Sequence, residues 1–222
     1  MSAISATERL EFEALCISAS ALDTNKSALL EIISEVALTT LFDDGALIKN
    51  IVLQTKATME ESIAANGIDI ALGRVAATIS ADGAIKEYTG GYEAYLRYKE
   101  YARDFDEKAE DLQSSLASLA KKIFTRDRLT VAYTGTRDEN FEESVINLFP
   151  TDGVSAGECK ITAFEKITEG VAIPSRVGYA VLGADGGKEA EGLLGALRVA
   201  RSILSYEYLW NVIRVMGGAY GT

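Results

Sequence analysis

The sequence predicts an α+β fold in which long helices pack on one face of a largely antiparallel sheet. Three observations support this prediction. Apolar and polar side chains alternate in three short stretches, at residues 10–22, 129–135 and 177–181. Between them, apolar residues recur at helical spacing over much longer stretches. Strands and helices are also grouped along the chain, an order typical of helices layered on one face of a sheet.

The first predicted strand is residues 10–22, which read LEFEALCISASAL. Within it we interpret Cys16 as a small core residue, because nothing nearby in the sequence would stabilise a thiolate. Residues 23–25 (DTN) are favourable helix N-caps. The apolar residues that follow lie on one helical face: Leu29, Leu30, Ile33, Val36, Ala37 and Leu41. The sequence therefore predicts an amphipathic helix that packs on the strand.

The middle of the chain is predicted to be helical. Residues 43–45 (DDG) end the first helix and cap a second, which runs from about residue 46 to 79 unless the Asn-Gly pair at 66–67 breaks it. Farther on, tyrosines recur every three residues, a spacing that falls about 60° short of a full turn at each step. This row winds round its helix, and we expect packing against neighbouring helices to explain it: Tyr92, Tyr95, Tyr98 and Tyr101.

A further amphipathic helix ends at about residue 124, and a short strand through Leu129 and Val131 follows. Residues 139–148 favour a helix, and residues 150–157 (PTDGVSAG) are rich in turn formers and resemble a linker in composition. Residues 158–169 are ambiguous. We then expect a strand at 177–181 and a final helix from about residue 189.

The final helix leads into the most unusual stretch of the chain, residues 203–222 (ILSYEYLWNVIRVMGGAYGT). Its apolar face stops at Gly217 and Gly218, which allow positive φ angles and close approach of another chain. Arg214 and Tyr220 can therefore point into one space. Periodicity alone also allows a plainer interpretation, in which Gly217 is only a helix C-cap, Arg214 complements the helix dipole and Tyr220 packs.

The composition limits the classes of function. The 222 residues include 22 Lys and Arg and 33 Asp and Glu, so the net charge is −11. A nucleic-acid partner is disfavoured, because it would call for clustered basic residues. The charge fits a surface that attracts basic peptides, and it fits a merely soluble acidic protein equally well. Neither glycine-rich spot, at 183–187 or at 217–218, has the sequence of a phosphate-binding loop.

The sequence also predicts a location. Cys16 and Cys159 lie far apart and indicate no disulfide framework, which favours a reducing compartment. The opening residues lack the basic and apolar regions of a signal peptide, and no apolar run is long enough to span a bilayer. We expect a cytoplasmic protein without a membrane partner, or an organellar one if a longer parent carries a transit peptide.

Residues 209–221 resemble the insulinase (pitrilysin) family of zinc metallopeptidases, most closely its presequence-protease subfamily. There a Leu-Trp-rich helix leads into Arg-x-x-Gly-Gly-Ala-Tyr-Gly, which this chain matches at Leu209, Trp210, Arg214, Gly217, Gly218, Ala219, Tyr220 and Gly221. Residues 90–108 and 120–135 resemble the same subfamily. The resemblance implies an insulinase-type metallohydrolase domain, the third of four. It implies that Arg214 and Tyr220, with Gly217 and Gly218 beside them, bind substrate in the family's chamber.

The resemblance implies that zinc is bound outside this chain. Insulinase-type peptidases bind zinc through His-x-x-Glu-His, and this sequence contains no histidine. We therefore expect this chain alone to be inactive, with no metal ligands of its own, and the catalytic N-terminal half of the same peptidase to be its partner. The adjacent acidic pairs point to different sides of a helix and are predicted to be solvated surface: Asp43-Asp44, Glu60-Glu61 and Glu142-Glu143.

The resemblance also implies a domain organisation. Residues 1–149 would form the helix-rich part of the third peptidase domain and residues 150–172 a linker. Residues 173–222 would form the strand-helix start of the following domain, truncated just after the Arg/Tyr signature, so we expect a segment of a longer peptidase.

Two hypotheses on function follow from the resemblance. In the first, the chain is a non-catalytic segment of a zinc-dependent metalloendopeptidase that degrades unstructured peptides in a closed chamber. In the second, it is a catalytically silent peptide-binding or assembly subunit of a separate active peptidase. An unrelated stand-alone enzyme is disfavoured, because no constellation of catalytic residues stands out.

Overall fold

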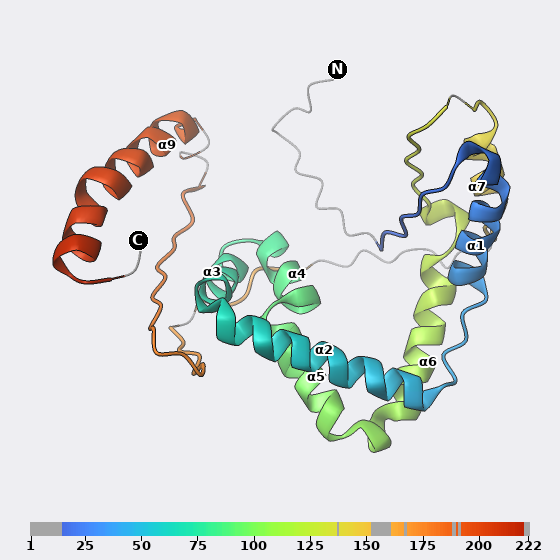
Figure 1. Cartoon of the computed structure of the whole chain (residues 1–222), viewed down its shortest axis with the longest axis horizontal. Coiled ribbons are helices and arrows are strands. Elements are labelled where there is room, and N and C mark those ends of the chain that lie inside the picture. The colour runs from blue at the N-terminus through green and yellow to red at the C-terminus, as the bar shows by residue number, and fades with distance from the viewer. Residues whose placement is uncertain are drawn as a thin grey trace. The chain divides into compact units, whose positions relative to one another are not determined.

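The computed structural model describes residues 15–136, 138–151, 161–166, 168–187, 190 and 192–219. The chain divides into two compact units, Met1–Val181 and Leu182–Thr222 (Figure 1). The predicted domain boundaries after residues 149 and 172 stay predictions. Helices form the regular structure of the first unit: η1 (Asp23–Asn25), α1 (Lys26–Leu38), α2 (Gly45–Ala65), α3 (Gly67–Ala77), α4 (Ala81–Gly90), α5 (Tyr92–Arg103), α6 (Phe105–Ile123), η2 (Arg126–Arg128) and α7 (Phe141–Ile146).

The prediction of an α+β fold with an antiparallel sheet is wrong, because the regular structure of the described residues is helical and contains no strand. The stretches that alternate like strands, at 15–22, 129–134 and 177–181, have no partner strand within the part of the chain that the structure describes. Alternation shows which side chains face a core, but a strand forms only where a second strand accepts its backbone hydrogen bonds. Cys16 is exposed, so its interpretation as a core residue is also wrong.

The predicted strand at residue 129 contributes to a core without joining a sheet. Ala37, Val145 and Phe149 are buried, and partly buried apolar side chains pack against them: Leu30, Phe124, Leu129, Val131 and Phe141. The ring of Tyr133 stacks on Phe141, with centroids 4.1 Å apart. Leu129 and Val131 therefore pack on one small core formed with α1 and α7, whereas Tyr133 is exposed and stacks on Phe141.

Helix boundaries in the middle of the chain confirm the predictions made from capping residues. The Asp44 carboxylate accepts a hydrogen bond from the Leu47 amide at 2.9 Å and begins α2. Helix α2 ends before Asn66, and α3 begins at Gly67, so the Asn-Gly pair does break the long helix. The Ser80 hydroxyl caps α4 in the same way, by accepting a hydrogen bond from the Gly83 amide at 3.0 Å.

Small residues allow α3 and α4 to pack closely. A Cβ atom at Gly83 would lie 2.3 Å from the carbonyl oxygen of Ala76, a distance that no side chain tolerates. Ala77 and Ala84 are fully buried beside it. Helix α4 in turn contacts α5, and α5 contacts α2. These four helices are the scaffold on which the polar network described below is built.

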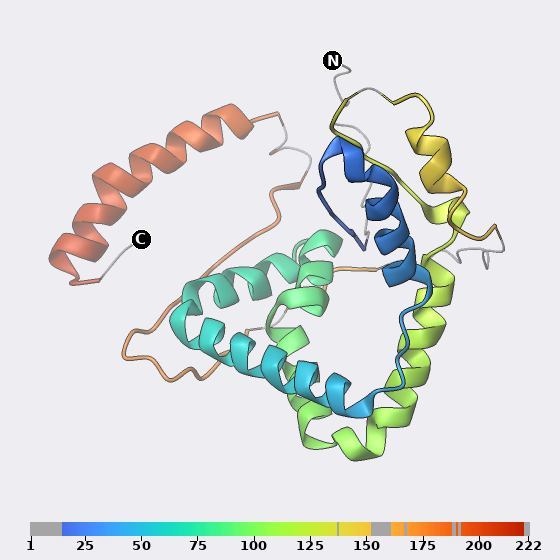
Figure 2. The same ribbon diagram turned by 45° about the vertical axis from the view of Figure 1, so that its right-hand side comes forward.

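Helix α5 carries the tyrosine row, and all four rings are half-buried. The Tyr95 hydroxyl donates a hydrogen bond to the Glu60 carboxylate of α2 at 3.0 Å, in agreement with the predicted packing against a neighbouring helix. After the turn that follows α5, α6 runs to the region of α1 and α7 in both views (Figures 1 and 2).

The second unit consists mainly of one long helix. Helix α9 (Leu194–Ile203) continues without interruption into η3 (Leu204–Met216), a π-helix whose hydrogen bonds join residues five apart. None of its residues is buried. Across the residues that the structure describes, every helix is too short or too polar to cross a membrane.

Candidate functional site

The predicted site lies where η3 ends. Met216 is the last helical residue and Gly217 is the C-cap, so the predicted glycine stop is confirmed. The Gly218 amide donates to the Arg214 carbonyl at 3.0 Å, and the Ala219 amide donates to the Ile213 carbonyl at 3.1 Å. These two nested bonds resemble a Schellman motif. Each of them spans one residue more than the corresponding bond at the end of an α-helix, because η3 is a π-helix. They satisfy carbonyl groups that a helix end would otherwise leave unpaired.

The two glycines serve this turn for different reasons. Gly218 has a φ of +72°, in the left-handed region that side chains with a Cβ atom rarely adopt. Gly217 has an ordinary φ of −87°, but a Cβ atom there would lie 2.5 Å from the Ile213 carbonyl oxygen. Replacing either glycine would therefore change the path by which the chain leaves the helix.

Arg214 lies in the last turn of η3, where a cation complements the negative end of the helix dipole. Its guanidinium carbon lies 4.3 Å from the centroid of the Trp210 ring, a cation–π contact between residues four apart. Tyr220 lies outside the described residues, so its predicted position beside Arg214 stays a prediction. The structure therefore brings Arg214 together with Trp210, Gly217 and Gly218.

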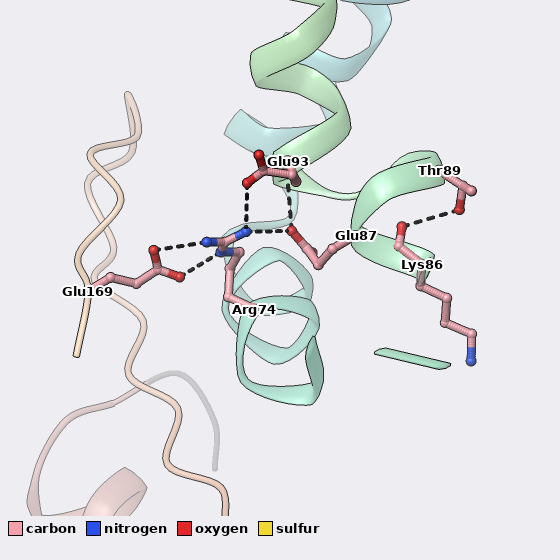
Figure 3. A network of polar contacts seen from close by, with 6 residues as sticks. All are labelled: Arg74, Lys86, Glu87, Thr89, Glu93 and Glu169. Carbon is pink, nitrogen blue, oxygen red and sulfur yellow. Dashed lines mark hydrogen bonds and ion pairs between the residues drawn. The ribbon is translucent and has the colours of Figure 1, made fainter. Parts of the chain in front are cut away.

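A second polar cluster was not predicted from the sequence, and it centres on Arg74 of α3 (Figure 3). Arg74 binds the Glu169 carboxylate through two hydrogen bonds, Nε to Oε1 at 2.6 Å and Nη2 to Oε2 at 3.1 Å. Its Nη1 donates to Glu87 at 3.0 Å and reaches Glu93 at 3.4 Å. One cation therefore links α3, α4, α5 and the segment that contains Glu169.

Burial makes Glu87 the critical partner in this cluster, since only 2% of the residue is exposed. Its Oε2 atom also accepts a hydrogen bond from the Glu93 amide at 3.2 Å. Cβ atoms added at Gly73 and Gly91 would lie 2.7 and 2.2 Å from Glu87 Oε1, so these glycines make room for the carboxylate. Hydrogen bonds from Arg74 to Glu169 and Glu87 outweigh its burial and raise the pKa of the guanidinium.

Contacts of Phe164 attach its segment to the same helices. The Phe164 amide donates a hydrogen bond to the Ala77 carbonyl at 2.8 Å, and the Phe164 ring meets Tyr88 edge to face at 5.2 Å. Arg74 also lies 5.4 Å from the Phe164 ring centroid. Three carboxylates and the rings of Tyr92 and Phe164 surround the Arg74 guanidinium. Because its nitrogen atoms already donate to protein carboxylates, the cluster is a structural clamp.

The acidic pairs lie on the surface, as predicted, and all six residues are exposed. Asp44 caps α2, and Glu60 accepts hydrogen bonds from Lys56 and Tyr95. Within the described part of the chain, no group of three or more histidine, cysteine, aspartate or glutamate residues could hold a metal ion. Because the sequence also contains no histidine, the side chains of this chain do not fit an insulinase-type zinc site.

Comparison with known proteins indicates the family. Residues 2–100 match the family model described as "Peptidase M16C associated". Protein HypA of Clostridium perfringens (strain 13 / Type A) is 30% identical over 209 residues, which cover 92% of this chain and 21% of that protein. Presequence protease 1, chloroplastic/mitochondrial, of Arabidopsis thaliana is 29% identical over 191 residues, or 81% of this chain and 17% of that protein.

A third relative, the mitochondrial presequence protease of Yarrowia lipolytica (strain CLIB 122 / E 150), is 23% identical over 208 residues, covering 90% of this chain and 21% of that protein. The chain spans about a fifth of the length of these curated relatives. The family model and the relatives agree with the resemblance found at the end of η3, which lies outside the residues that the family model matches. Together, the family model and the relatives support a presequence-protease-like segment of the insulinase family, similar to the segments associated with M16C peptidases.

Proposed function

We propose that this chain is a non-catalytic segment of a zinc-dependent metalloendopeptidase that degrades unstructured peptides in a closed chamber. In this proposal Arg214 and Tyr220 bind substrate at an active site completed by the catalytic half of the same peptidase. The observation that carries the proposal is the end of η3, where two glycines required by the backbone follow an arginine in the last helical turn. The names of two relatives, both presequence proteases, support it.

The roles of the two side chains follow from their chemistry. A guanidinium presents N–H donors along its edges, and these suit a substrate carbonyl or carboxylate. The Tyr220 phenol would donate a hydrogen bond to the oxyanion that develops when a peptide carbonyl is attacked. Removal of one such donor costs roughly 3 kcal/mol of transition-state stabilisation in typical enzymes. Zinc would be held by histidines of the catalytic half, since this chain supplies none.

The proposal is tested by substitutions in the full-length peptidase that contains this segment. We expect Tyr220→Phe to lower kcat for an unstructured fluorogenic peptide by about 100-fold or more, with little change in KM. Arg214→Ala should lower kcat/KM, because it removes a side chain that binds the substrate. Arg198→Ala, a change at another exposed arginine of the same long helix, is the matched control and should leave both parameters unchanged.

Two results would contradict the proposal. An unchanged kcat in Tyr220→Phe would exclude its role at the oxyanion, and cleavage by this chain alone would exclude a composite site. Zinc content and cleavage are therefore also measured for this chain alone and after mixing with the catalytic half. Stimulation of a peptidase that already contains its own copy of this segment would instead favour the silent-subunit hypothesis.

A further inference from the structure

We propose that Trp210 is a positioning residue for Arg214: its indole ring holds the guanidinium in the orientation in which it meets the substrate. The inference rests on the proposed substrate-binding role of Arg214 and extends it to a residue that would not touch the substrate itself. Trp210 is the only tryptophan of the chain.

The Arg214 guanidinium lies close over the Trp210 ring, and this contact is the Arg214–Trp210 stack. The guanidinium carbon of Arg214 lies 4.3 Å from the Trp210 ring centroid, the shortest of the cation–ring distances found among the described residues. Residues four apart are neighbours on a helical surface, so the contact needs no other element to form. Trp210 is 41% exposed, which leaves the ring accessible at the helix surface instead of sequestered in a core.

A stack of this kind orders the arginine without using its hydrogen-bonding edges. The ring attracts the face of the guanidinium, whereas the N–H donors lie in the guanidinium plane and point outward from it. The same side chain can therefore rest on Trp210 and bind a carbonyl or carboxylate. A free arginine side chain populates many rotamers, and a side chain ordered before binding loses less conformational entropy when substrate arrives.

The backbone hydrogen bonds at the end of η3 support the same inference. Arg214 supplies its carbonyl to the Gly218 amide, so the backbone at the base of its side chain is held by the glycine turn. Trp210 lies four residues earlier on the same helix and has only two side-chain torsions to order. The turn therefore holds the base of the arginine side chain, and the indole holds its end.

The stack is measured directly by fluorescence, because one tryptophan makes indole emission specific to this site. We expect Arg214→Ala and Arg214→Lys, in the 222-residue chain, each to shift the emission of Trp210. A lysine keeps the charge but lacks the planar group that stacks. Arg198→Ala is the control and should leave the emission unchanged. Identical spectra for the wild type and both Arg214 variants would overturn the inference.

The positioning role is then tested by kinetics in the full-length peptidase. We expect Trp210→Leu to lower kcat/KM by roughly 3- to 30-fold, the range that a cation–π contact supports, mainly through KM. Trp210→Phe, which keeps a smaller ring, should recover part of the loss. Tyr208→Leu removes another exposed aromatic ring from η3 and should have no effect. The double variant Trp210→Leu/Arg214→Ala should be no worse than Arg214→Ala alone.

The outcomes separate this inference from the proposed function. Full activity in Trp210→Leu, with a defective Arg214→Ala variant, would overturn the positioning role and leave the proposed role of Arg214 standing. Full activity in Arg214→Ala would overturn both, even if the fluorescence still reported the stack. Losses of Trp210→Leu and Arg214→Ala that multiply in the double variant would show that Trp210 acts independently of Arg214, and would also overturn the inference.

Discussion

Arg74 lies among three carboxylates that differ in their access to water. Glu87 is buried, whereas the side chains of Glu93 and Glu169 are each 31% exposed. An exposed carboxylate that loses its cation is solvated by water, but a buried one has no such replacement. The stabilising effect of Arg74 therefore depends chiefly on Glu87, although Glu169 makes the bidentate contact.

We expect Arg74→Met to lower the free energy of unfolding by about 3–5 kcal/mol, because Glu87 would remain buried without its cation. Glu169→Gln should lower it by no more than about 1 kcal/mol, since its carboxylate is partly solvated. Urea unfolding followed by circular dichroism measures both. Equal losses for the two variants would show that burial of Glu87 does not control the strength of the cluster.

For single residues, the sequence allowed prediction of local features but not of the cluster round Arg74. Gly217 and Arg214 were assigned correctly to a helix end, because a C-cap and its last turn are adjacent in the chain. The partners of Arg74 lie 13, 19 and 95 residues away, and no local spacing connects them. The one available signal was Gly73, which lies inside the helix predicted for residues 46–79 and had no role there.

Among the helices, the contact between α3 and α4 is the one most sensitive to side-chain size. Gly83 and Gly90 both belong to α4, but only Gly83 faces another backbone. A Cβ atom at Gly83 would lie 2.3 Å from the Ala76 carbonyl oxygen, whereas at Gly90 nothing lies within 4 Å. The two glycines therefore form a matched pair for testing the packing of this helix.

Gly83→Ala should destabilise the chain by about 1–3 kcal/mol, because backbone atoms cannot move aside without separating the helices. Gly90→Ala should be neutral or stabilising by up to about 1 kcal/mol, since alanine favours the helix and meets no obstacle. Thermal unfolding of the two variants checks this prediction. A neutral Gly83→Ala variant would mean that α3 and α4 are not in close contact.

Helices could be predicted more reliably than strands for a physical reason. A helix satisfies its own backbone hydrogen bonds, so Asp44 and the Asn66-Gly67 pair determine its boundaries locally. The stretch through Leu129, Val131 and Tyr133 has the alternation of a strand, and its first two side chains do pack on a core. Its backbone would need a neighbouring strand, which alternation alone cannot supply.

For the molecule as a whole, the net charge of −11 is the property most relevant to peptide binding. If the chain binds unstructured peptides as proposed, a basic peptide should associate with it about 10-fold or more faster than an acidic peptide of equal length at low salt. At 1 M salt, where the Debye length is about 3 Å, the difference should largely disappear.

The comparison is made by stopped-flow fluorescence with uncleavable peptides, and a neutral peptide of the same length serves as the control. Its association rate should not depend on salt. Equal rates for the basic and acidic peptides at low salt would show that the overall charge does not steer substrates, and would leave the site at the end of η3 as the main determinant of recognition.

The clamp at Arg74 also has a consequence for the order in which the chain folds. The Arg74–Glu169 pair closes a loop of 95 residues, while α3, α4 and α5 meet across turns of a few residues. Loop closure costs more conformational entropy as the loop lengthens, by about 0.6 kcal/mol for each doubling. We therefore expect the helices to associate first, and the segment that carries Phe164 and Glu169 to dock afterwards on a surface that already exists. In the native protein, we also expect the contacts of Phe164 and Glu169 to open and close again while the helices beneath them stay folded.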